Sequence, residues 1–165
     1  MGSVNCDELE KHPLFRKVRA VTDRLPRGDE QQGREYNFVS KEQFQSMVDN
    51  GDMLEHTRYA GFDYGICKDE VESIWEEGHI AIKPVDISGA KAIKSIYPDR
   101  TLTLFVRRDK EALLTSLLSR DAPLEDKVSR VMTLDAEFAN ESLCDWTISN
   151  NGSLTHAVEQ VLRLL

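Results

Sequence analysis

Short apolar segments with strand composition alternate with helical segments along most of this chain, and this alternation constrains its fold more than any other feature. The apolar stretches include FRKVRAVT, HIAIKPVDI and TLTLFV. Strands that alternate with helices are typical of an α/β fold, in which helices flank a parallel sheet. Residues 35–66 are richer in short strands and predict a small β-containing insertion. Residues 110–141 hold two helical patterns and predict a flap.

Local signals place individual elements. In SKEQFQSMVDNG, Ser40 is a good helix N-cap and Gly51 a good helix stop. DMLEHTRYAGFDYG predicts two short strands around a turn at Gly61. The closing SLTHAVEQVLRLL predicts an amphipathic helix whose inward residues are Leu154, Ala157, Val158, Val161 and Leu162.

The composition limits what this chain can do. Its 165 residues predict a single domain, 1–165, and a net charge of −8 disfavours nucleic-acid binding. Three separated cysteines and four histidines show no metal-ligand spacing, so we predict no metal site and no disulfide framework. No apolar run approaches the ~18 residues of a membrane span. The first residues lack a signal-peptide core, and we expect a cytoplasmic location.

One polar run stands out against this acidic background. TDRLPRGDEQQGREY, residues 22–36, carries Arg24, Arg27 and Tyr36 at fixed offsets around a proline and two glycines. Guanidinium groups and a phenol can surround a phosphate with directed donors. A solvated loop with surface ion pairs is the other interpretation. A local positive site on an acidic protein favours a small anion over a polymer. Asp86, like the 23–27 segment, follows an apolar strand, so both are expected to face one crevice.

Several separated motifs together resemble the guanylate kinase family, a group of P-loop nucleoside monophosphate kinases. They are TDRLPRGDEQQGREYNFV, NGDMLEH, GFDYG, DISGAKAIK and DWTISNNGSL, which follow the family's order and spacing from about Leu9 to Leu165. The resemblance implies a parallel sheet with flanking helices, a GMP-binding insertion at 35–66 and a helical lid at 110–141.

The resemblance also implies roles for single residues. The residues implied to hold the phosphate of GMP are Arg24, Arg27, Tyr36 and Tyr64. Glu55 resembles the base reader, because one carboxylate accepts from guanine N1–H and N2–H₂ together and adenine offers neither donor. Asp86 resembles a guanine-side contact. Alternatively, Glu55 is an exposed strand residue, Tyr64 a core residue and Asp86 a helix cap.

The remaining implied roles concern ATP. Arg120 and Arg130 resemble lid arginines that close over the transferring phosphate, and Asn150 resembles a position near the adenine of ATP. The two arginines are equally consistent with ordinary helix-surface charges.

The sequence departs from the family pattern at several positions. The phosphate loop G-x-x-x-x-G-K-[ST] occurs nowhere in the 165 residues. Pro84 stands where the family has an acid associated with magnesium, and Ser116 stands at a usual lid arginine. Asp23 stands at a usual threonine and would repel phosphate unless it is turned away. We therefore expect impaired phosphoryl transfer, since that reaction depends on positioning and charge stabilisation.

Two classes of function are compatible with these features. One is a non-catalytic guanylate-kinase-like module that binds GMP or another phosphorylated ligand, with a phosphopeptide as one such partner. The other is a guanylate kinase that converts ATP and GMP to ADP and GDP, represented by an N-terminally truncated chain. Magnesium and ATP are expected as cofactors only in the second class.

Overall fold

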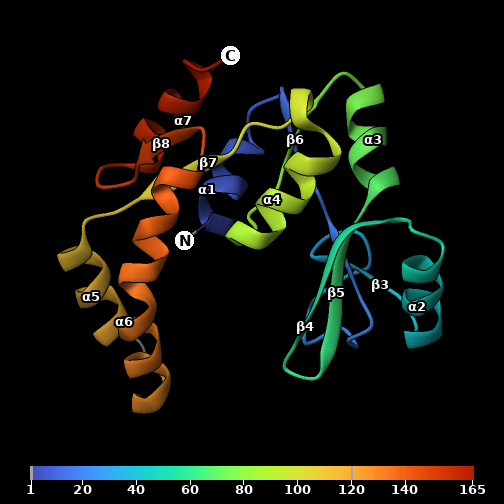
Figure 1. Cartoon of the computed structure of the whole chain (residues 1–165), viewed down its shortest axis with the longest axis horizontal. Helices are drawn as coiled ribbons and strands as arrows, with labels where there is room; N and C mark the ends of the chain where they lie inside the picture. Colours follow the sequence, from blue (N-terminus) through green and yellow to red (C-terminus); the bar gives the residue numbers. More distant parts are fainter. Residues whose placement is uncertain (1, 120) are drawn as a thin grey trace. The chain divides into compact units, whose positions relative to one another are not determined.

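The computed structural model describes the backbone of residues 2–119 and 121–165, and the side chains from Cys6 onward in the same ranges. The chain has a mixed α/β architecture and divides into two units, Met1–Thr101 and Leu102–Leu165 (Figure 1). The predicted α/β fold class is confirmed, whereas the single domain 1–165 stays a prediction.

The first unit contains most of the strands. Its helices are α1 (Gly2–Leu9), α2 (Lys41–Asp49), α3 (Lys68–Glu76) and α4 (Ile87–Ile96), followed by a 3₁₀ turn at Pro98–Arg100. Its strands are β1 (Phe15–Lys17), β2 (Ala20–Thr22), β3 (Tyr36–Phe38), β4 (Met53–Tyr59), β5 (Phe62–Cys67) and β6 (Ile80–Ile82).

A four-stranded sheet dominates this unit, with the order β3-β2-β5-β4. β2 runs parallel to β3 and antiparallel to β5, and β4 and β5 form an antiparallel hairpin. Ala60 and Gly61 both have positive φ, 50° and 85°, as a tight hairpin turn requires. The two strands predicted around Gly61 are thus confirmed. The sheet also takes in β2, which lies outside the predicted insertion 35–66.

The stretch FRKVRAVT, predicted as one strand, forms two strands in different sheets. β1 pairs in parallel with β6, while β2 joins the four-stranded sheet. The break falls at Val18 and Arg19, whose amides bond to the Ile82 carbonyl at 2.9 Å and to Glu70 Oε1 at 3.0 Å. β2 and β6, the strands that precede 23–27 and Asp86, belong to separate sheets. The expectation that these two segments face one crevice therefore stays a prediction.

Two apolar clusters hold the first unit together. Val18, Leu54, Ile66, Val71 and Ile74 form one, which joins α3 to β4 and β5. The second consists of Val21, Phe44 and Cys67 and holds α2 against the sheet. α2 begins as predicted: the Ser40 hydroxyl accepts from the Gln43 amide, and the Gln43 side chain accepts from the Ser40 amide.

The second unit is smaller. It contains β7 (Leu104–Arg107), α5 (Lys110–Leu118), α6 (Leu124–Ala139), a 3₁₀ turn (Asn140–Leu143), β8 (Trp146–Ser149) and α7 (Leu154–Leu162). β7 and β8 pair in parallel. α7 packs on β8, and Ala157 and Val161 are buried, as predicted for its inward face.

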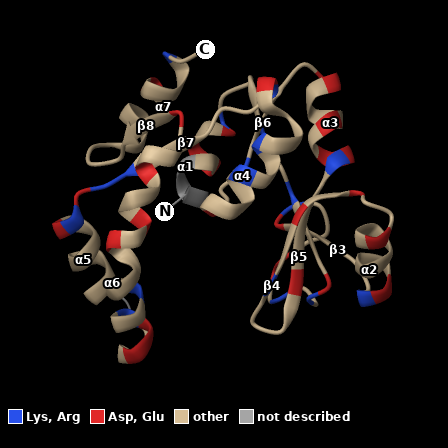
Figure 2. Cartoon of the chain, in the orientation of Figure 1, with Lys and Arg blue, Asp and Glu red and all other residues tan. Residues whose placement is uncertain are grey.

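Charged residues of both signs occur on both units (Figure 2). None of the helices in the described ranges is long and apolar enough to span a membrane.

Candidate functional site

The 23–35 loop, between β2 and β3, is anchored at its base by Thr22. The Thr22 side chain is fully buried. Its hydroxyl donates to the Asp63 carbonyl at 2.8 Å and accepts from the Arg24 amide at 3.2 Å. One buried hydroxyl therefore ties the start of the loop to β5.

Arg24 lies inside this loop rather than on its surface. Its side chain is 5% exposed, and each guanidinium nitrogen is used. Nε donates to the Tyr64 hydroxyl at 3.2 Å, Nη1 to the Leu25 carbonyl at 2.9 Å and Nη2 to Glu30 Oε1 at 3.0 Å. The guanidinium carbon also lies 5.5 Å from the Tyr36 ring centroid and 5.8 Å from that of Phe38. Arg24 is thus fixed by hydrogen bonds and ring faces.

Glu30 holds the two arginine segments of the loop together. Its second oxygen, Oε2, accepts from the Arg27 amide at 2.7 Å. The hydrogen bond from Arg24, and then the one from the Arg27 amide, lower the pKa of the Glu30 carboxyl. The turn between Arg27 and Glu30 includes Gly28 at φ 50°, a conformation that glycine adopts without strain. The Glu30 carboxylate therefore fixes the position of the Arg27 backbone.

Arg27 and Arg34 are the exposed arginines of the loop, and Arg34 pairs with Glu35. Among the described residues, neither the Arg27 guanidinium nor the Tyr36 hydroxyl has a hydrogen-bond partner. Tyr36 and Tyr64 meet edge to face with ring centroids 5.9 Å apart, which brings their elements together. The arrangement offers an incoming anion one unpaired guanidinium and phenol donors beside a fixed buried cation.

Asp23 is turned away from these donors. Its Oδ1 accepts from the Asp63 amide at 2.8 Å, and its own amide donates to the Asp63 carbonyl at 3.3 Å. The carboxylate at this position therefore extends the β2–β5 ladder and is held by the backbone of β5.

Glu55 lies on β4 against the start of α4. Its carboxyl carbon is 3.6 Å from the point where a Cβ on Gly89 would stand, which places Glu55 beside the first turn of α4. Asp86 is the N-cap of α4 and accepts from the Gly89 amide at 2.8 Å, as the capping alternative predicted. Burial, and then the charge of Asp86, raise the pKa of Glu55. The described residues provide no hydrogen bond to the Glu55 carboxylate.

Lys83 is a half-buried cation near Glu55 that the sequence did not indicate as a site residue. It follows β6, and its ammonium donates to the Val18 carbonyl at 3.0 Å. Burial, and then the charge of Lys17, lower its pKa to about 8. The signal in the sequence was a lysine directly after an apolar strand.

The other predicted site residues belong to the second unit or lie outside the described ranges. Arg130 is exposed on α6, and Ser116 lies on α5. Asn150 follows β8 and is half-buried, and its amide donates to the Arg107 carbonyl at 2.7 Å. Arg120 lies outside the described residues. The roles of these residues stay predictions.

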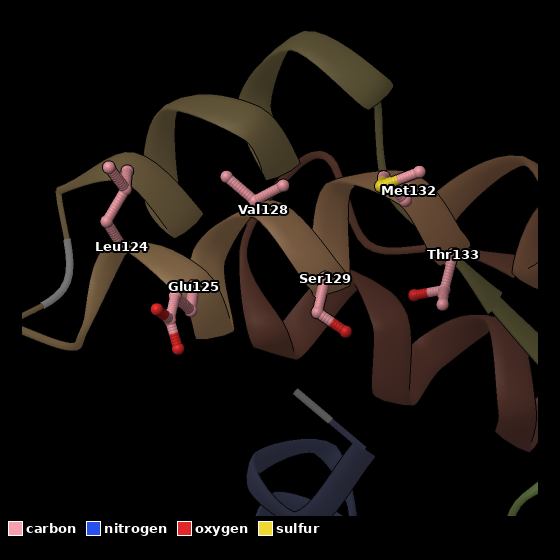
Figure 3. Close-up of a pocket in the computed structure, with 6 residues that line it drawn as sticks. All are labelled: Leu124, Glu125, Val128, Ser129, Met132 and Thr133. Carbon is pink, nitrogen blue, oxygen red and sulfur yellow. The ribbon is translucent and has the colours of Figure 1, made fainter.

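A hollow of about 500 Å³ lies along the exposed side of α6 (Figure 3). Its lining comes from that helix alone: Leu124, Glu125, Val128, Ser129, Met132 and Thr133. It contains none of the predicted site residues, and a ligand pocket usually has convergent polar groups from several elements. We therefore place the candidate site at the 23–35 loop and Glu55.

Within 2–119 and 121–165, no group of three or more histidine, cysteine, aspartate or glutamate side chains is placed to hold a metal ion.

Comparison with known proteins gives consistent results. The family model described as guanylate kinase matches residues 9–165. A guanylate kinase of Porphyromonas gingivalis is 34% identical over 149 residues, covering 88% of this chain and 79% of its own length. One of Cutibacterium acnes is 30% identical over 166 residues, covering 99% and 83%. The crystal structure of guanylate kinase from Anaplasma phagocytophilum shares the fold, with a TM-score of 0.75 at 20% identity over 99% of this chain and 79% of that one.

Proposed function

This chain belongs to the guanylate kinase family, and from that premise we propose that it binds GMP at the 23–35 loop, with β3 and the β4–β5 hairpin completing the site. The observation that carries the proposal is the difference between the environments of two arginine side chains. Arg24 is buried and each of its guanidinium nitrogens makes a hydrogen bond, whereas the Arg27 guanidinium has no partner among the described residues. A loop built in this way holds one cation fixed and presents another to a ligand.

The phosphate of GMP would meet Arg27, the two phenol hydroxyls and the field of the Arg24 guanidinium. Charge-assisted hydrogen bonds to a phosphate are the strong ones, and an arginine fork adds directionality. Because Arg24 is already ordered in the free chain, little conformational entropy is lost at that residue on binding. These features support phosphate recognition by Arg24, Arg27, Tyr36 and Tyr64.

The guanine base would meet Glu55. A half-buried carboxylate with no donor among the described residues is costly unless a ligand supplies hydrogen bonds. Guanine supplies two adjacent donors, N1–H and N2–H₂, while adenine presents an acceptor at N1. Asp86 lies next to Glu55 but already caps α4, so we assign it a supporting place on the guanine side.

Phosphoryl transfer from ATP to GMP is the second candidate function, favoured by the names of the relatives. It would need magnesium and ATP, with Arg120 and Arg130 over the transferring phosphate and Asn150 near the adenine. The given 165 residues contain no G-x-x-x-x-G-K-[ST] motif, and Pro84 offers no carboxylate. For this polypeptide by itself we propose GMP binding with impaired turnover. The comparisons give no support to a phosphopeptide partner.

Two measurements test these proposals. Amide chemical shifts recorded with and without GMP should change mainly in 22–36, at Glu55 and in 59–65, and changes confined to other regions would contradict the site. ADP release from ATP, GMP and magnesium should be far below the ~1–10³ s⁻¹ usual for enzymes. Turnover in that range, abolished in Arg27→Ala, would instead establish the kinase reaction for this polypeptide.

A further inference from the structure

Asp23 and Asp63 continue the β2–β5 ladder by one residue, and a side chain completes their pairing. In an antiparallel ladder, two hydrogen-bonded residues exchange both backbone N–H···O bonds. Here the Asp23 amide donates to the Asp63 carbonyl at 3.3 Å, but the Asp63 amide donates to Oδ1 of Asp23 at 2.8 Å. The Asp23 carboxylate thus stands in for a backbone carbonyl, at the residue where the chain leaves β2 for the 23–35 loop.

The residues next to this pair belong to the proposed phosphate site. Arg24 follows Asp23, Tyr64 follows Asp63, and Nε of Arg24 donates to the Tyr64 hydroxyl at 3.2 Å. Thr22, which pairs with Tyr64 in the ladder, adds a hydrogen bond from its hydroxyl to the Asp63 carbonyl at 2.8 Å. The contact between Arg24 and Tyr64 therefore joins two segments whose backbones are already tied together at the preceding residue of each.

We propose that Asp23 is a positioning residue for the phosphate of GMP, which acts through Arg24 and Tyr64 by holding β5 against the start of the loop. This inference rests on the proposed function. From the sequence alone, an aspartate here would repel phosphate unless it is turned away, whereas in the structure its side chain accepts a hydrogen bond from a backbone amide. That role needs the side-chain oxygen and not the negative charge, so an asparagine should fill it and an alanine should not.

The first test needs no nucleotide. Hydrogen exchange with water is measured by NMR for the Asp63 amide and the Arg24 Nε–H in the native chain and in three variants: Asp23→Asn, Asp23→Ala and Asp69→Ala. Both protons should exchange at the native rate in Asp23→Asn and faster in Asp23→Ala, because local opening becomes easier. Asp69→Ala, at an exposed position on α3, should match the native chain. Faster exchange of the Asp63 amide without any change at Arg24 would overturn the inference. Asp23→Leu replaces Asp23→Ala if the latter does not fold.

The second test compares the GMP affinities of Asp23→Asn and Asp23→Ala by calorimetric titration. Both variants lack the carboxylate charge and only the first keeps the acceptor, so their ratio separates the hydrogen bond from any repulsion of phosphate. The loss of one hydrogen bond predicts GMP binding that is roughly twofold to tenfold weaker in Asp23→Ala than in Asp23→Asn. Guanosine, which has the base but no phosphate, should bind both variants equally. Equal GMP affinities, or an equal loss with guanosine, would contradict a role at the phosphate.

The two proposals fail in different ways. A native chain that binds GMP, while Asp23→Asn and Asp23→Ala bind it equally well, overturns this inference alone. A native chain that does not bind GMP overturns the proposed function and the positioning role with it, whatever the exchange rate of the Arg24 proton.

Discussion

The Glu30 carboxylate accepts from the Arg24 guanidinium at 3.0 Å, and the arginine in this pair is buried. The other oxygen of Glu30 accepts from the Arg27 amide. One acidic side chain thus fixes the buried Arg24 guanidinium and the backbone from which the exposed Arg27 side chain extends. In an acidic protein, this is how a loop with three arginines keeps a defined structure.

Glu30→Gln should flatten the decline in stability on the acid side. The folded chain holds the pKa of Glu30 below its usual 4.5. A group with a depressed folded pKa stabilises the fold above the unfolded value, and this contribution is lost as pH falls through the folded one. The native free energy of unfolding should therefore fall more steeply below about pH 4.5 than that of the variant, as measured by urea unfolding.

Glu76→Gln, at an exposed position on α3, is the matched control for this change and should follow the native profile. If the free energy of unfolding of the Glu30 and Glu76 variants fell equally steeply at acid pH, the ion pair between Glu30 and Arg24 would contribute nothing to stability.

Arg27→Ala should weaken GMP binding by about 1.5–3 kcal/mol, because it removes a hydrogen bond between charged groups. The fold should be unaffected, since the exposed guanidinium supports no contact within the described residues. Calorimetric titration and thermal unfolding check the two parts. Lys41→Ala removes an exposed charge from α2 in the same unit, and it should leave the affinity as it is. Equal affinities for native chain and Arg27→Ala would remove Arg27 from the site.

Glu55→Gln should narrow the preference for GMP over AMP. The amide keeps the size of the side chain but replaces one acceptor oxygen by a donor, which leaves a guanine donor unpaired. A buried polar group without a partner costs about 1–3 kcal/mol, so we expect the preference for GMP to narrow by roughly fivefold or more. The ratio of the two dissociation constants is the measurement. A ratio that does not change would show that another group reads the base.

Lys83→Met should change stability on the alkaline side. The folded chain releases the Lys83 proton near pH 8, whereas the unfolded chain keeps it to about 10.5. The unfolded state binds more protons in this window, so the contribution of Lys83 to the free energy of unfolding rises with pH. The free energy of unfolding of native chain and variant is measured with denaturant at several pH values from 7 to 10. The variant should be the more stable of the two at pH 7, and this difference should shrink as the pH rises to 10. A constant difference would contradict this.

Local structure in this chain could be predicted where it depends only on residues that are close together in the sequence. The N-cap at Ser40 and the hairpin turn at Gly61 depend on neighbouring residues alone, and both form as expected. The inward face of α7 follows from helical spacing and was also correct at Ala157 and Val161. Such features need no knowledge of the rest of the fold.

Features that depend on distant contacts could not be predicted. The division of FRKVRAVT into β1 and β2 depends on Ile82 and on Glu70, which lie more than 50 residues further along. The burial of Arg24 requires Tyr64 from the hairpin. The partial burial of Lys83 depends on Val18, 65 residues away in the sequence, whose carbonyl accepts from the lysine ammonium. None of these pairs is marked by local spacing.

Calorimetric titration of the native chain with GMP and with AMP, under identical buffer and salt, tests the central claim most directly. We predict saturable binding of one GMP per chain, and AMP binding weaker by tenfold or more. Equal affinities for the two nucleotides, or no heat change with GMP at millimolar concentration, would contradict a guanine-reading site at Glu55 and the 23–35 loop.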